Sequence, residues 1–134
     1  MNEKFAIDTN ILIYARDMSH SEKFQIAMNI LDYEPVVSTQ VALEYLNVIK
    51  RLFKISKQEC MEICLCDIEN CDFHPVTYST LQRAYKLQQR YDFQMFDSII
   101  VAAALESDCN ILYSEDMHHG LIIEKQLKIV NPFV

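Results

Sequence analysis

The sequence predicts an α/β fold with a short parallel central sheet flanked by helices on both faces. Short apolar runs that are typical of buried strands alternate along the 134 residues with longer segments of helical periodicity. This alternation is typical of parallel sheets, whose strands are covered by the helices that connect them. The length fits one domain, so we expect a single domain over residues 1–134.

The first quarter of the chain supplies two strands and two helices. Residues 4–7 form an apolar-rich strand that ends at an Asp-Thr-Asn turn, and residues 11–15 form a short helix. Apolar residues recur at helical spacing over residues 21–33, and Pro35 ends that helix. Residues 36–37 are both valine and predict a brief buried strand.

Capping residues mark the next two helices. Ser38 caps a helix over residues 39–53, in which most apolar residues lie on one arc. Ser56 is followed three residues later by Glu59, which is a capping-box signal for a helix that extends to about residue 70. These signals predict two consecutive helices before the chain returns to the sheet.

The second half repeats the alternation of strands and helices. We expect a strand at residues 73–76, a helix over 77–91, a strand at 110–113 and a last strand at 127–130. Residues 96–107 are apolar almost all round, so the helix that they form must be buried on most sides.

Composition excludes several classes of protein. Hydrophobic residues make up 51% of the chain, which argues against disorder, and the single glycine, Gly120, leaves no glycine-rich loop for a nucleotide. No apolar run approaches the roughly 18 residues of a membrane span, and no signal peptide is visible at the N-terminus. The net charge of −7 disfavours nucleic acid, although bound divalent cations would reverse the charge of an acidic site.

The odd number of cysteines suggests reduced thiols and a cytoplasmic protein. The stretch from Cys60 to Cys71 resembles a zinc site in composition, but it contains no Cys-x-x-Cys pair and no suitably spaced histidine. We therefore interpret these residues as helical core cysteines. The five cysteines are Cys60, Cys64, Cys66, Cys71 and Cys109.

Four acidic residues are the candidates for chemistry. Asp8 and Asp116 follow predicted strands, at the edge where parallel sheets bind ligands. Asp97 shares a helical face with apolar residues, and Glu44 lies at the edge of an apolar arc. Each acid alone also has an ordinary interpretation as a cap, a turn residue or a boundary residue paired with Arg51.

Together, the four acids indicate bound divalent cations. Carboxylates gathered in one place repel one another unless they are protonated or bind cations. Mg²⁺ and Mn²⁺ prefer oxygen ligands. The sequence offers no histidine pair spaced for zinc and no serine or cysteine nucleophile with a recognisable base. We therefore predict a Mg²⁺ or Mn²⁺ site.

Three segments resemble the acidic segments of the PIN domain family. Residues 7–15, IDTNILIYA, are similar to the opening of PIN domains. Residues 38–51, STQVALEYLNVIKR, resemble the second acidic segment, and residues 96–117, FDSIIVAAALESDCNILYSEDM, resemble the third and fourth. The segments keep the family's order and spacing over nearly the whole chain. In its size and in the pattern of these segments, the chain is similar to VapC-type toxins of bacterial toxin–antitoxin pairs.

The resemblance implies a role for each matching residue. Asn10 matches a position that orients the first acid, and Ser114 matches a hydroxyl beside the fourth. Phe96 stands where many relatives carry tryptophan, which affects packing and not chemistry. The family's metal-binding, catalytic quartet falls on Asp8, Glu44, Asp97 and Asp116.

The resemblance also implies a function. It predicts a Mg²⁺- or Mn²⁺-dependent endoribonuclease that cleaves a tRNA or ribosomal RNA site with metal-activated water. We expect Asp8 and Asp97 to hold the better-occupied ion, with Glu44 and Asp116 completing the site directly or through water. The implied partners are an RNA substrate, a small antitoxin protein and a second copy of the chain in a homodimer. Alternatives within the family are an RNA-processing nuclease and a non-catalytic RNA- or protein-binding module with a vestigial site.

A different enzyme class also deserves comparison. Haloacid-dehalogenase-like phosphatases place an aspartate after the first strand, but they need a second aspartate two residues later. Asn10 occupies that position here. The sequence therefore favours the nuclease.

Basic residues and apolar residues supply candidate contact surfaces. RNA contacts are expected from Lys50, Arg51, Lys54 and Lys57 just beyond the helix of Glu44, with a second set at Arg83, Lys86 and Arg90. Solvated helix faces explain both sets equally well. The region of Ile11, Leu12 and Ile13 and the helices near residues 24–53 are candidate partner surfaces, and core packing is the alternative.

Overall fold

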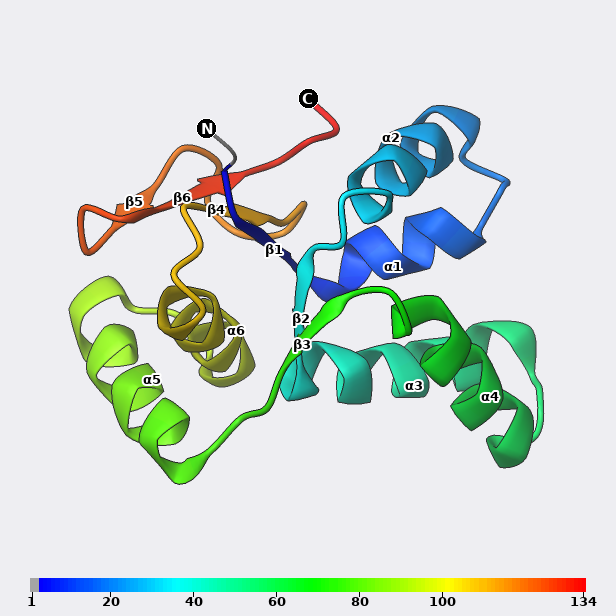
Figure 1. The fold of residues 1–134 in the computed structure, drawn as a ribbon, viewed down its shortest axis with the longest axis horizontal. Coiled ribbons are helices and arrows are strands. Elements are labelled where there is room, and N and C mark those ends of the chain that lie inside the picture. The colour runs from blue at the N-terminus through cyan, green and yellow to red at the C-terminus, as the bar shows by residue number, and fades with distance from the viewer. Residues whose placement is uncertain (1–2) are drawn as a thin grey trace.

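The computed structural model describes residues 3–134, in which a central sheet lies between two groups of helices (Figure 1). Helix α1 packs against both α2 and α3, α3 packs against α4, and α5 packs against α6 across the sheet from α1 and α2. The described helices are α1 (Thr9–Arg16), α2 (Ser21–Leu31), α3 (Thr39–Phe53), α4 (Lys57–Ile68), α5 (Tyr78–Tyr91) and α6 (Met95–Glu106).

The sheet of residues 3–134 has six strands in the order β3-β2-β1-β4-β6-β5. All neighbouring pairs are parallel except β5 and β6. The predicted α/β fold with a mostly parallel sheet is therefore confirmed. The strands are β1 (Phe5–Ile7), β2 (Val36–Ser38), β3 (Asp72–His74), β4 (Ile111–Tyr113), β5 (Ile122–Ile123) and β6 (Leu127–Val130).

The register of the central strands determines which residues meet at the carboxyl edge. In the pairing of β1 with β4, Ile7 lies opposite Tyr113. The next residues along the two strands are Asp8 and Ser114, so their side chains emerge side by side. Strand β2 pairs with the other side of β1 and ends at Ser38, whose hydroxyl caps α3 by accepting the N–H of Val41 at 3.2 Å.

The capping signals of the sequence are confirmed. The Ser56 hydroxyl accepts the N–H of Glu59 at 3.1 Å, and the Glu59 carboxylate accepts the N–H of Ser56 at 3.2 Å. Helix α1 begins at Thr9, two residues before the predicted start, because Asp8 serves as its N-cap.

The core places α6 in the interior. Residues 100–105 of this helix are all buried, as its apolar composition predicts. Ile11 and Leu12 are 0% and 1% exposed. The interpretation of these two side chains as a partner surface is therefore wrong, because they pack into the core, and Ile13 is half-buried against it.

The cysteines divide between core and surface. Cys60 and Cys64 of α4 are buried, as predicted for helical core residues. Cys66 is exposed, so the core interpretation is wrong there, and Cys71 lies half-buried beyond the end of the helix. Cys109 is buried beside β4, outside any helix.

Other boundaries also differ from the prediction. Strand β3 covers residues 72–74 and not 73–76, because its pairing with β2 starts at Val36 and Asp72 and Pro75 cannot donate to a ladder. Strand β5, with two residues, is absent from the prediction. Among the helices of residues 3–134, none has the length and apolar character that a membrane crossing requires.

Candidate functional site

Asp8 occupies the centre of the carboxyl edge of the sheet. Its backbone N–H continues the sheet by donating to the carbonyl of Tyr113 at 2.9 Å. One carboxylate oxygen accepts the N–H of Thr9 at 2.7 Å, and the other accepts the hydroxyl of Ser114 at 2.7 Å. Asp8 is 5% exposed, so its carboxylate is fixed in an almost buried position.

The two polar neighbours of the quartet have exchanged partners relative to the prediction. Ser114 binds the first acid, Asp8, at 2.7 Å, and it also accepts the N–H of Met117 at 3.2 Å. Asn10 donates to the fourth acid, Asp116, at 3.2 Å. The hydrogen bonds therefore pair Ser114 with the first acid and Asn10 with the fourth, because the strand register places Ser114 beside Asp8.

Glu44 faces α1 from the second turn of α3. Its carboxylate accepts the hydroxyl of Thr9 at 3.3 Å and the side-chain amide of Gln40 at 2.9 Å. No ion pair joins Glu44 to Arg51 within residues 3–134, which contradicts the ordinary interpretation of Glu44. Thr9 thus links the first and second acids, since its N–H binds one and its hydroxyl the other.

Asp97 and Asp116 complete the acidic group from two further elements. Asp97 is half-buried in the first turn of α6, and Asp116 is exposed in the segment that follows β4. Phe96 precedes Asp97 and is 56% exposed, so it does not anchor the third acid by core packing.

The electrostatics show that the four acids share one region. Burial raises the pKa of Asp8 to about 6 against the opposing hydrogen bonds from Ser114 and Thr9, and the charges of Asp97 and Glu44 raise it further. Burial also raises the pKa of Asp97, as do Glu44 and Asp116. Each of the four therefore acts on at least one other, although they come from four separate segments.

Among residues 3–134, no basic side chain forms an ion pair with the predicted quartet. The ion pairs found within residues 3–134 use Asp67, Asp72, Glu106, Glu115 and Glu124, and none uses a member of the quartet. Within the described residues, the acids therefore repel one another without a counterion, and a cation from solution could supply the missing positive charge.

The oxygen donors fit a hard divalent cation that keeps part of its water shell. Carboxylate oxygens are the ligands that Mg²⁺ and Mn²⁺ prefer. Across residues 3–134, no three His, Cys, Asp or Glu side chains are arranged closely enough to form a ready-made metal cage. Mg²⁺ usually binds through one or two carboxylates and retains several waters, so an open group of acids fits it better than zinc.

Comparison with known families agrees with this geometry. The sequence pattern of the PIN domain matches residues 5–120, which include all four acids. The chain belongs to the PIN domain family. Membership in this family points to a nuclease, and it sets aside the haloacid-dehalogenase-like alternative. A comparison with curated protein sequences gives no significant match.

Solved structures share the fold of this PIN domain at low sequence identity. A chain of a toxin–antitoxin complex from Klebsiella pneumoniae is 18% identical, with a TM-score of 0.68 over 97% of this chain and 98% of the other. VapC20 from Mycobacterium tuberculosis, described as a sarcin-ricin loop cleaving toxin, is 15% identical, with a TM-score of 0.64 over 84% and 90%. VapBC2 from Rickettsia felis, bound to promoter DNA, is 15% identical, with a TM-score of 0.61 over 84% and 87%.

The basic candidates of the PIN domain lie at the end of α3 and along α5. Lys50, Arg51 and Lys54 are exposed at the end of α3, and ten residues of helix separate Glu44 from Lys54, or roughly 15 Å. Arg90 of α5 pairs with Glu124 at 3.2 Å. Within residues 3–134, no ion pair engages the α3 set, so we take it as the first candidate for RNA contact.

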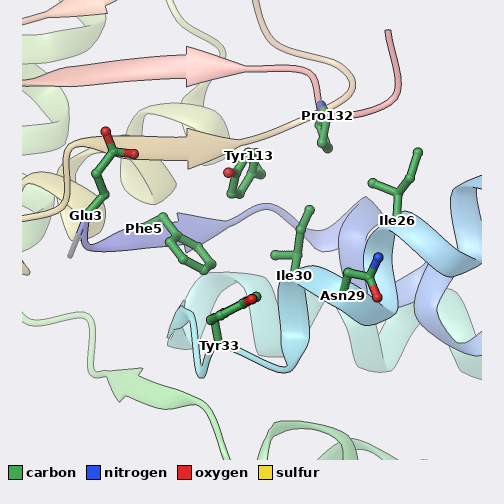
Figure 2. Close-up of a pocket in the computed structure, with 8 residues that line it drawn as sticks. All are labelled: Glu3, Phe5, Ile26, Asn29, Ile30, Tyr33, Tyr113 and Pro132. Carbon is green, nitrogen blue, oxygen red and sulfur yellow. The ribbon is translucent and has the colours of Figure 1, made fainter. Parts of the chain in front are cut away.

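An open cavity of about 810 Å³ lies elsewhere, between α2 and the strands β1 and β4 (Figure 2). Phe5 and Tyr113 meet edge to face on its sheet side, with ring centroids 5.3 Å apart. None of the four acids lines it. The cavity is therefore separate from the residues that the sequence predicts to carry the chemistry. The lining residues are Glu3, Phe5, Ile26, Asn29, Ile30, Tyr33, Tyr113 and Pro132.

Several contacts of the site are missing from the sequence prediction. Gln40 precedes Glu44 by four residues, and helical spacing alone would have suggested that contact. The contact of Thr9 with Glu44 spans 35 residues and that of Lys23 with Glu115 spans 92. No local pattern predicts these two, because they depend on how the helices pack.

Proposed function

We propose that this PIN domain is a Mg²⁺- or Mn²⁺-dependent endoribonuclease that acts as the toxin of a VapBC-like toxin–antitoxin pair. The observation that supports it best is a group of four mutually repelling carboxylates without a basic partner among residues 3–134. Phosphodiester cleavage requires positive charge near the scissile phosphate, and acids that recruit divalent ions meet this requirement.

Asp8 and Asp97 would hold the better-occupied ion. Asp8 is the most buried of the quartet, and Thr9 and Ser114 bind both of its oxygens. Glu44 and Asp116 would complete the site through water, which agrees with the open spacing of the acids. When bound, the divalent ion supplies an acidified water and neutralises charge that develops on the phosphate.

The remaining polar residues orient the acids. The hydroxyl of Ser114 and the N–H of Thr9 fix the carboxylate of Asp8, and Asn10 holds Asp116 from α1. Such outer partners align the ligating oxygens and raise metal affinity. Lys50, Arg51 and Lys54 would bind the phosphates of RNA beyond the acidic edge.

The proposed partners follow from the structural neighbours. Two neighbours come from toxin–antitoxin complexes, which supports a small antitoxin protein as partner. The sarcin-ricin loop cleaved by VapC20 supports a ribosomal RNA substrate, and tRNA is the other substrate class. We propose a homodimer that acts in the cytoplasm, where both RNA classes are found.

Digestion of purified ribosomal RNA and total tRNA, with 1 mM Mn²⁺ or with EDTA, tests the function. We expect discrete fragments with Mn²⁺ and none with EDTA. The Asp97→Asn variant should leave both RNAs intact. Equal cleavage in metal-free buffer, or by Asp97→Asn, would show a contaminating nuclease or a different mechanism. Intact RNA under every condition, with tight RNA binding, would favour the binding module.

Co-expression tests the toxin role. We expect wild-type protein to arrest growth of a bacterial host and Asp97→Asn to leave growth unchanged. Expression of the gene adjacent to the coding sequence should restore growth if it encodes the antitoxin. Normal growth of cells that contain active nuclease would instead favour an RNA-processing enzyme.

A further inference from the structure

Glu115 is an acid outside the quartet, although it lies directly between Ser114 and Asp116 in the chain. Its carboxylate accepts the hydroxyl of Tyr14 at 2.7 Å and forms an ion pair with the ammonium of Lys23. Lys23 also donates to the Tyr14 hydroxyl at 3.2 Å, so the three side chains are mutually bound. We call Tyr14, Lys23 and Glu115 the Lys23 cluster.

The cluster ties the segment after β4 to the hairpin of α1 and α2. Tyr14 belongs to α1 and Lys23 to α2. Asn10, also on α1, accepts the backbone N–H of Glu115 at 3.4 Å and donates to Asp116 at 3.2 Å. The segment that carries the fourth acid is therefore held by three side chains from the two neighbouring helices.

Aromatic packing supports the position of Lys23. Its ammonium lies 4.7 Å from the ring centre of Tyr14 and 5.6 Å from that of Phe133. The two rings also meet edge to face, with centroids 5.0 Å apart. Lys23 is therefore surrounded by a carboxylate, a hydroxyl and two aromatic faces, which restricts it more than a surface lysine.

We propose that Lys23 and Tyr14 are positioning residues that hold Asp116 at the metal site through Glu115. Asp116 is exposed and has Asn10 as its hydrogen-bonding partner, so its location depends on the backbone beside it. Binding of Glu115 to the helices keeps this adjacent carboxylate from competing for the cation and fixes the backbone of Asp116. The proposal rests on the proposed function, because it takes Asp116 as a metal-binding acid.

The ion pair of Lys23 and Glu115 should contribute little to the stability of the whole fold, so its loss can reveal a positioning role. The Lys23 and Glu115 side chains are 37% and 23% exposed, and ion pairs as accessible as this add little to global stability. Removal of Lys23 should therefore change the local order of residues 114–117 and leave the melting temperature nearly constant. A purely structural role would produce the opposite result.

Amide hydrogen exchange and Mn²⁺ titration test the proposal. In Lys23→Met, we expect several-fold faster exchange at residues 115–117 and about tenfold weaker Mn²⁺ binding by calorimetry. For RNA, kcat should fall while KM is unchanged, since Glu115 and Tyr14 engage the Lys23 ammonium and the proposal gives it no contact with the substrate. Lys23→Arg should restore wild-type values, and Tyr14→Phe, which keeps the ring, should show an intermediate loss. Lys128→Met, at an exposed position of β6 outside both candidate RNA-binding sets, is the matched control.

The two readouts separate this proposal from the function on which it rests. Unchanged exchange and Mn²⁺ affinity in both Lys23→Met and Tyr14→Phe would overturn the positioning role. A general rise in exchange across the core would also overturn it, because the cluster would then support the whole fold. If wild-type protein neither binds Mn²⁺ nor cleaves RNA, the proposed function fails and the positioning of a metal ligand fails with it. Faster exchange at residues 115–117 would then identify a cluster that only orders the segment.

Discussion

Asp8 combines burial with two strong hydrogen bonds, and these act on its pKa in opposite directions. Burial opposes the charged form, while Ser114 and the N–H of Thr9 favour it. Burial prevails, because the pKa rises from 3.8 to about 6. The charged carboxylate therefore costs stability in its buried position, and the cation of the proposed function would offset that cost.

The first prediction is that metal-free protein becomes less stable as pH rises from about 4 to about 6. In this range the folded state binds more protons at Asp8 than the unfolded state, so the free energy of unfolding falls with rising pH. A rise in pKa from 3.8 to about 6 corresponds to roughly 3 kcal/mol. Urea unfolding in EDTA between pH 4 and pH 7 measures the difference between wild type and Asp8→Asn.

Asp8→Asn should remove most of this dependence and be the more stable protein at pH 7. Asparagine can still accept the N–H of Thr9, and the Ser114 hydroxyl can turn to accept from the amide. Asp92→Asn, at an exposed helix end, is the control and should keep the wild-type profile. If the free energy of unfolding depended on pH in the same way in wild type and Asp8→Asn, the pKa of Asp8 would be the same in the folded and unfolded states.

The second prediction is that Asp97→Asn lowers Mn²⁺-dependent cleavage by at least roughly 100-fold, because a charged ligand contributes several kcal/mol to the transition state. The same change should raise the metal-free melting temperature, since Asp97 is repelled by Glu44 and Asp116. Cleavage assays and thermal unfolding in EDTA measure the two effects. Asp108→Asn is the control just beyond α6, where a φ of 59° suits asparagine. A loss of activity together with a loss of stability would indicate misfolding instead.

At the scale of elements, α3 joins the acidic edge to the basic candidates. Its first turns carry Gln40 and Glu44 at the site, and its last turn carries Lys50 and Arg51, followed by Lys54. A bound RNA would cross from the cation at one end to these side chains at the other, over roughly 15 Å. This distance corresponds to a few nucleotides of backbone.

The third prediction is that Lys50→Gln/Lys54→Gln raises KM for RNA roughly tenfold and leaves kcat unchanged. Phosphate contacts supply binding without chemistry, and their loss also makes KM less dependent on salt. Steady-state cleavage at several KCl concentrations measures both effects. Lys125→Gln/Lys128→Gln is the matched control, because Lys54 and Lys125 both have positive φ, 50° and 57°. Equal effects of the two pairs would indicate net charge alone.

Elements whose signals are local could be predicted from the sequence. The starts of α3 and α4 follow from Ser38 and from the Ser56–Glu59 capping box, because a cap and its helix are adjacent in the chain. Strand β5 could not be predicted, since its two residues become a strand only by pairing with β6. The places of Asp8 and Asp116 just beyond β1 and β4 follow from the strand signals, whereas the partners of Asn10 and Ser114, each some 106 residues away, required the register.

At the scale of the whole molecule, part of the net negative charge comes from the predicted quartet, where bound cations would offset it. The chain has 19 acidic and 12 basic residues, and four of the acids meet at one edge of the sheet. Divalent ions at that edge would reverse the local charge and let an acidic protein approach RNA. Folding and metal binding should therefore be linked.

The fourth prediction is that millimolar Mg²⁺ or Mn²⁺ raises the melting temperature of the protein. An ion that binds the folded chain at 100 times its Kd adds about 2.7 kcal/mol to the free energy of unfolding. The gain should be larger at pH 7 than at pH 5, because protons compete for Asp8, whose pKa is about 6. Scanning fluorimetry over a titration of each ion measures the shift.

Screening by salt is the effect that this measurement must exclude, because dissolved ions weaken repulsion between carboxylates wherever they lie. KCl at matched ionic strength should give only a small shift, equal in wild type and Asp97→Asn. Mn²⁺ should give a large shift in wild type and little in Asp97→Asn, since site binding needs that ligand and screening does not. Equal shifts in melting temperature by KCl and Mn²⁺ would mean that the four acids do not bind a common ion. The proposed metal-dependent mechanism would then be wrong.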